Sequence, residues 1–169
     1  MLPLLIACPA ERLGVEVPSG GVDKISVEDM QRDAYALTRP DADPGAVFTH
    51  RLGQMRLPPT VTGEGRVCAR HGGEGPARVV VAPWPATGPT FYEDAARAAV
   101  LISIAKGWDG QPPSRKTTWL CMAKAGAPLP EGERVEVGVD VEADRLEAID
   151  YRTLRDDMQA FFRVLEGGP

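Results

Sequence analysis

The run from Arg78 to Ala123 constrains the fold more than any other part of the chain. An apolar segment, Arg78–Ala82, is followed by a loop broken by Pro and Gly, an Ala- and Ile-rich segment over Phe91–Lys106, and a second apolar segment, Thr117–Ala123. Parallel strands need a crossover connection, which is usually helical and right-handed. The order therefore predicts two parallel strands joined by a helix, and with them an α/β fold.

Three further helices are expected around this unit. Ser26 can cap a helix whose apolar face starts at Val27, and Asp43 can cap a second one with Pro44 in its first turn. From Tyr151 onward, apolar residues recur at helical spacing opposite a charged face, which is typical of a helix packed on a sheet.

Further strands are expected at Val67–Arg70, Arg134–Val141 and, more briefly, Leu146–Ile149, and the HGGEG stretch at 71–75 is expected to form a tight turn. Together these elements predict a three-layer α/β/α sandwich with a mixed sheet of about five strands.

Composition narrows the classes of function. A chain of 169 residues fits one domain with a real core, and its net charge of −5 argues against a nucleic-acid binder. No run of 18 apolar residues is present, so no transmembrane helix is expected.

The amino terminus resembles a bacterial lipobox. Leu5-Ile6-Ala7-Cys8 places small and branched residues before a cysteine that would be lipidated, although no Lys or Arg precedes it. Either the start codon lies upstream, or Met1 is the true start and the segment is a frayed or packed terminus. We expect residues 1–24 to form a signal-like terminus and tether, and residues 25–169 to form one domain. The expected location is the cell envelope, with a lipid anchor, or otherwise the cytoplasm.

The succession of elements from Ser26 to Asp140 resembles the zinc aminopeptidase family of bacterial leucyl aminopeptidases, glutaminyl cyclases and the transferrin receptor ectodomain. The family has an R-x-P-G-(S/T) turn between two helices, and ALTRPDADPGAVFTHRLGQM is similar to it. A strand motif, N-V-(I/V)-A-x-x-x-G, is compared with GRVCARHGGEG. The motifs V-V-V-G-A-H-x-D, G-A-D-D-N-A-S-G and a strand ending in Glu-Glu are compared with VVVAPWPA, TFYEDAARAAVLISIAK and TTWLCMAKAG.

The resemblance implies that the family's metal ligands are replaced in this chain. At most of the positions that match the family's zinc ligands, this chain has side chains that cannot bind zinc. Only Asp140 and the acids beside the position of the bridging Asp could still act as ligands. The matching positions are Trp84 and Ala86 for the strand motif, Tyr92 with neighbouring Glu93 and Asp94 for the bridging Asp, and Ala125 and Gly126 for the Glu-Glu pair.

The expected function is that of a non-catalytic, aminopeptidase-like binding module without a cofactor. Its cleft would be formed by Trp84, Phe91, Tyr92 and Glu93 and would take a peptide or a protein partner. Two alternatives remain: a zinc exopeptidase whose ligands are misaligned, with Asp94 and Asp140 as weak candidates, and a truncated fragment that needs a missing half or a partner subunit.

The cysteines and histidines offer little other chemistry. Cys68 and Cys121 lie in strand-like contexts, where they can be buried thiols or a disulfide, and the sequence leaves this open. His71 is expected to be exposed on its turn, and His50 to lean on the sheet. A Cys68–His71 pair is the only local nucleophilic option.

Overall fold

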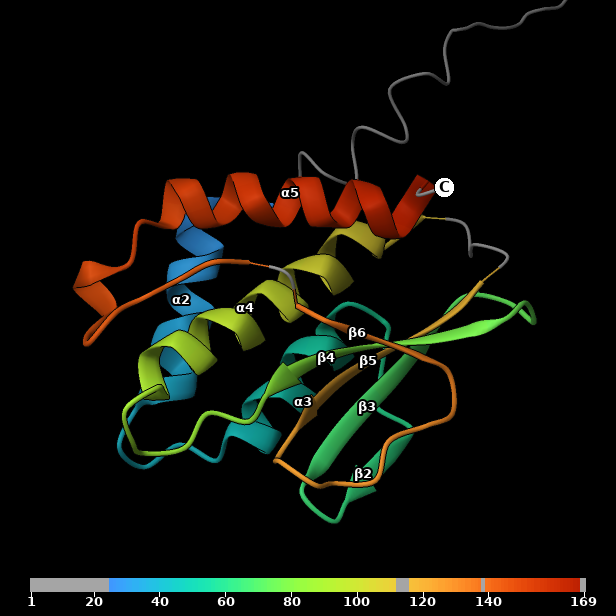
Figure 1. Cartoon of the computed structure of the whole chain (residues 1–169), viewed down its shortest axis with the longest axis horizontal. Helices are drawn as coiled ribbons and strands as arrows, with labels where there is room; N and C mark the ends of the chain where they lie inside the picture. Colours follow the sequence, from blue (N-terminus) through green and yellow to red (C-terminus); the bar gives the residue numbers. More distant parts are fainter. Residues whose placement is uncertain (1–24, 112–115, 138, 168–169) are drawn as a thin grey trace, which may run out of the picture.

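The computed structural model describes residues 25–111, 116–137 and 139–167, so Cys8 and the tether lie outside the described residues (Figure 1). Ten elements follow one another: α2 (Val27–Thr38), α3 (Pro44–Gln54), β2 (Val61–Gly63), β3 (Arg66–His71), β4 (Ala77–Pro83), α4 (Phe91–Trp108), β5 (Thr117–Ala123), β6 (Glu133–Glu136), the 3-10 helix η1 (Leu146–Ala148) and α5 (Tyr151–Gly167).

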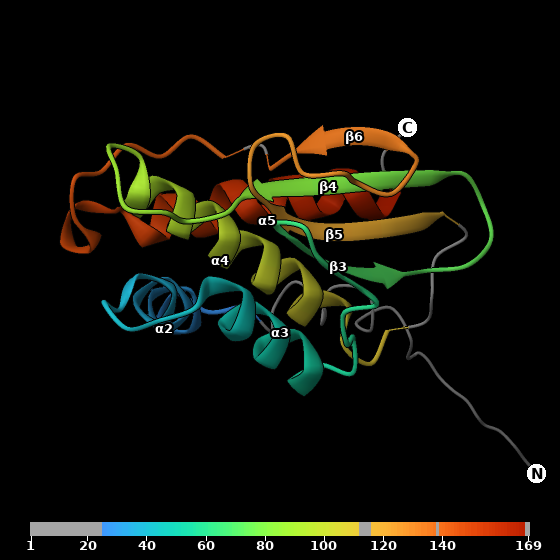
Figure 2. The same ribbon diagram turned by 90° about the horizontal axis from the view of Figure 1, so that it is seen from below.

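The described strands form one mixed sheet in the order β2-β3-β5-β4-β6, which Figure 2 shows for its last four strands. Strand β4 is parallel to both β5 and β6, whereas β3 is antiparallel to β2 and β5. The unit formed by β4, α4 and β5 is thus the parallel pair with a helical connection that the sequence predicted. The predicted α/β sandwich with a mixed sheet of five strands is confirmed. Within the described residues the α-helices pack on one face of the sheet, so the expected third layer is not found there.

The main hydrophobic core lies on one face of the sheet, and each of the four described α-helices contributes to it. Helix α4 is central, because it contacts β4, β5 and each of the other three α-helices. It is buried around most of its circumference, which explains why its sequence is apolar throughout instead of amphipathic. Helix α5 packs through the stripe that begins at Tyr151, as predicted, and Met158 and Phe162 are among its buried members.

The other face of the sheet carries a smaller cluster around a disulfide. Cys68 on β3 and Cys121 on β5 are directly opposite in register, 4.2 Å apart between Cα atoms, and they are bonded. The question that the sequence left open is thereby answered. Val79 and Val81 flank the disulfide, and Leu129 from the β5–β6 connection packs against this cluster.

The helix starts follow the predicted capping chemistry. Ser26 Oγ accepts a hydrogen bond from Asp29 N at 3.1 Å, and Asp43 Oδ1 accepts one from Gly45 N at 3.1 Å. Each bond satisfies an amide that has no partner within its own helix.

Three strand predictions are wrong or incomplete. Residues 146–148 form the 3-10 helix η1 and not a strand, and β6 ends at Glu136 instead of Val141. The fifth strand is β2, a three-residue partner of β3 that is too short to show a period in sequence. The stretch at 71–75 does not close a hairpin, because β5 lies between β3 and β4.

Helix α5 is fastened to the sheet by a buried arginine. Arg78 on β4 donates to Leu165 O near the carboxyl end of α5, and its Nε donates to Thr118 Oγ1 at 2.8 Å. Trp108 Nε1 donates to Glu166 Oε2 at 2.6 Å in the same region. A cation that binds the last carbonyls of a helix satisfies orphan acceptors and opposes the negative end of the helix dipole.

Candidate functional site

The candidate site lies at the carboxyl ends of β4 and β5, where open α/β sheets usually bind ligands. Trp84 follows β4 and donates from its backbone N to Ala123 O at 3.0 Å, while Lys124 follows β5 and donates from N to Gly65 O at 2.8 Å. These two bonds place the side chains of Trp84 and Lys124 beside each other and next to the β2–β3 turn.

Trp84 is half-buried and packs between a helix start and a lysine. A Cβ atom added to Gly45 in the first turn of α3 would lie 2.7 Å from Trp84 Cη2, so the indole approaches this helix as closely as a glycine permits. Lys124 Nζ lies 5.2 Å from the centroid of the Trp84 ring, within the range of a cation–π interaction.

A groove of about 490 Å³ opens beside Trp84, between α3 and the β2–β3 hairpin. Its described lining consists of Asp43, Gly45, Ala46, Thr49, His50, Thr62, Gly63, Gly65, Arg66, Val67 and Trp84. The hairpin turns at Glu64 (φ 57°) and Gly65 (φ 81°), and two successive positive φ angles are typical of the tight turns that join twisted strands.

The charges at the groove differ in how they are paired. Arg66 Nη1 donates to Pro128 O at 2.9 Å, and its Nη2 lies 3.8 Å from Glu64 Oε2. Asp43 is occupied as the cap of α3. Lys124 is exposed and makes no salt bridge with any described residue. Lys124 is not among the lining residues, but it lies beside the groove over the Trp84 ring and has no counter-ion among the described residues.

The other residues predicted for the cleft lie at the start of α4. Phe91 and Tyr92 pack edge to face with ring centroids 5.1 Å apart, and Glu93 Oε2 accepts a hydrogen bond from Ala143 N at 3.1 Å. None of the three belongs to the described lining of the Trp84 groove. Glu93 instead holds the segment after β6 against α4.

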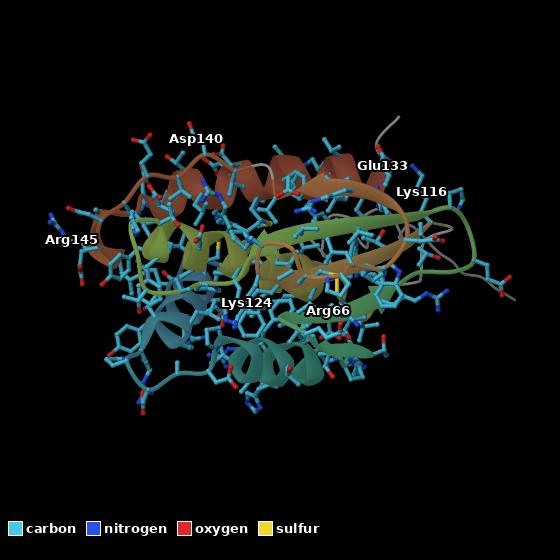
Figure 3. All side chains as sticks on the ribbon, turned by 60° about the horizontal axis from the view of Figure 1, so that its bottom comes forward. Arg66, Lys116, Lys124, Glu133, Asp140 and Arg145 are labelled. Carbon is cyan, nitrogen blue, oxygen red and sulfur yellow. A yellow bond between two sulfur atoms is a disulfide. The ribbon has the colours of Figure 1, made fainter. Side chains whose placement is uncertain are left out.

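The two acids considered for metal binding lie in ordinary polar settings. Asp94 accepts from Thr90 Oγ1 at 2.8 Å and lies 3.6 Å from Arg97, so it supports the first turn of α4. Asp140 is exposed after β6 (Figure 3). Among the residues that the structure describes, no three His, Cys, Asp or Glu side chains are grouped as a metal site would need.

The prediction that His71 is exposed is wrong. Its ring stacks on the Trp108 indole, 4.4 Å between centroids and 4° from parallel. Burial lowers the pKa of His71, and the carboxylate of Glu166 opposes that shift. Cys68 is tied up in the disulfide, so it cannot form a nucleophilic pair with His71. His50, which we expected to lean on the sheet, is exposed and lines the groove.

A cluster of charged side chains joins α2, α3 and α4 and was not predicted from the sequence. Asp33 on α2 is buried, and its Oδ1 lies 2.7 Å from Arg51 Nε on α3. Burial raises the pKa of Asp33 to about 6, although Arg51 opposes the shift. Asp29 pairs with both Arg32 and Lys106. Asp33 falls on the apolar face of its helix, which was the only signal in the sequence.

A scan against models of known protein families finds no match to this chain, and no curated protein sequence matches it. No helix in the described ranges is long and apolar enough to cross a membrane.

Proposed function

We propose that this protein is a non-catalytic, aminopeptidase-like module that binds a peptide or protein partner at the Trp84 groove. The proposal rests on which residues follow β4 and β5. Trp84 and Lys124 lie there beside an open groove of about 490 Å³. A tryptophan supplies a large contact area at low entropy cost, which suits binding. Neither side chain is a zinc ligand at neutral pH.

The order of elements is consistent with the ancestry that we propose. Two helices, two strands, a helix and a strand succeed one another along the described chain as the resemblance requires, apart from the added β2. Gly45, in the Pro-Gly turn that carries the resemblance, lies against Trp84, the residue that the resemblance matches with a metal-binding histidine of the family.

We further propose that the protein is exported and held at a bacterial cell envelope through lipidated Cys8. The Cys68–Cys121 disulfide supports this location, because disulfides persist in oxidising compartments and are rare in the cytosol.

The proposal is tested by combining a zinc measurement with a binding measurement on the full chain. We expect no stoichiometric zinc after exposure and desalting, no hydrolysis of aminoacyl-anilides, and saturable binding to members of a peptide panel. Retained zinc with hydrolysis that a chelator stops would overturn the proposal in favour of an exopeptidase.

A matched pair of variants locates the binding surface. Ala46→Phe should block binding, because Ala46 is exposed on α3 and lines the groove. Gln54→Phe places the same side chain at an exposed position of the same helix outside the groove, and it should leave binding unchanged. Equal binding by both variants, or no peptide binding by the wild type, would reject the groove as the site.

A further inference from the structure

Lys124 lies at the border of the groove and is the charged side chain for which an interaction with the half-buried ring of Trp84 is found among the described residues. It is exposed, makes no salt bridge to any described residue, and lies 5.2 Å from the centroid of the Trp84 ring that lines the groove. Its neighbours give it no carboxylate, because Asp43 caps α3 and Glu64 lies toward Arg66. A ligand with a carboxylate would complete this charge arrangement.

The edge strand that lines the groove favours an extended chain over a compact acid as the ligand. Thr62 and Gly63 line the groove and belong to β2, which pairs with a described strand on one side only. The backbone groups on the other side of an edge strand can pair with an added peptide. The opposite edge of the sheet differs, because β6 carries Glu133, Arg134 and Glu136, and such charges discourage pairing.

From the charge and the edge together, we propose that the Trp84 groove binds an extended acidic peptide segment of a partner protein. An apolar side chain of that segment packs on Trp84, and a neighbouring carboxylate pairs with Lys124. This inference rests on the proposed function, since it names the kind of peptide that the same groove takes.

Three peptides that differ only in charge test the inference. Each has seven residues, blocked ends and a central Leu, with Glu, Gln or Lys at the flanking positions. At low ionic strength we expect the Glu peptide to bind roughly three- to tenfold more tightly than the Gln peptide, and the Lys peptide most weakly. Because the contact is exposed, added salt should narrow the difference.

Charge reversal at two sites provides the matched control. Lys124→Glu should remove or invert the preference for the Glu peptide. Arg145→Glu makes the same change of charge at an exposed residue in another part of the molecule and should preserve the preference (Figure 3). Both positions are exposed, so neither change should alter the melting temperature appreciably.

The outcomes separate this inference from the proposed function. If all three peptides bind equally and binding is still blocked by Ala46→Phe, the groove binds peptides but the acidic preference is refuted. If Lys124→Glu binds the Glu peptide as the wild type does, the assigned contact is refuted. If no peptide binds at all, the inference and the proposed function both fail.

Discussion

At the scale of single residues, the contact between Gly45 and Trp84 is tight. The missing Cβ of Gly45 is what lets Trp84 Cη2 lie against α3, since a methyl group there would sit 2.7 Å away. Glycine otherwise weakens a helix relative to alanine by roughly 0.5–1 kcal/mol. The Trp84 indole thus explains why glycine, and not alanine, occupies position 45 of α3.

Gly45→Ala should therefore lower the free energy of unfolding of the wild type by about 1–3 kcal/mol, the usual range for overpacking. In a Trp84→Ala background the same change should be neutral or stabilising, because the clash is gone and alanine favours the helix. A double-mutant cycle by urea unfolding measures the coupling. Additive effects of the two substitutions would contradict the contact.

Asp33 makes stability depend on pH. Its carboxyl has a pKa of about 6 in the folded protein against an ordinary value of 3.8, so the folded state binds the proton more tightly than the unfolded state. The stabilisation from Asp33 is complete below about pH 4 and is lost as the pH rises through about 6. It amounts to at most about 3 kcal/mol.

Asp33→Asn removes this titration. Because other acids also titrate, the quantity to measure is the difference in unfolding free energy between wild type and Asp33→Asn from pH 4 to pH 7.5. We expect the wild type to lose stability relative to the variant as the pH rises. A difference that stays constant, or that grows in favour of the wild type, would contradict the assigned pKa.

At the scale of elements, the disulfide joins two neighbouring strands that are far apart in the chain. Cys68 and Cys121 are 53 residues apart in sequence. Closing a loop of that length reduces the entropy of the unfolded chain and thereby raises its free energy by about 4 kcal/mol. The crosslink fixes β3 beside β5, a pairing that lies outside the β4–α4–β5 unit.

Replacing both cysteines with alanine should lower the free energy of unfolding by up to about 4 kcal/mol. Thiol titration of the denatured full chain, produced without lipidation and folded under oxidising conditions, should find one reactive thiol, Cys8, before reduction and three after it. Cys8→Ser serves as the control and should leave the unfolding midpoint unchanged. Three reactive thiols in this unreduced, unlipidated protein would disprove the crosslink.

The elements also differ in how far the sequence predicts them. The caps at Ser26 and Asp43 are local signals, and both are found in the structure. The short strand β2 carries no periodic signal, and the segment at 146–148 has apolar residues but forms a 3-10 turn. A pattern of two or three residues cannot distinguish a strand from a 3-10 helix, because the conformation of so short a segment depends on what packs against it.

At the scale of the whole molecule, the sequence predicts the α/β class but not which strands are neighbours. The helical connection between β4 and β5 determines their parallel pairing, whereas the insertion of β5 between β3 and β4 depends on contacts distant in sequence. The sequence likewise predicts only part of the candidate site. Trp84 is placed by its strand, but the separation of Phe91 and Tyr92 from its groove follows from how α4 packs.

The buried guanidinium of Arg78 has a consequence for synthesis on the ribosome. Its acceptor, Leu165 O, emerges 87 residues later, after all the described strands of the sheet have been made. Until α5 arrives, the nascent sheet holds a charge that must stay hydrated, because an unpaired buried ion is costly. The growing chain is thus kept open on its helical face until α5, the last of the described helices, packs on it and closes the core.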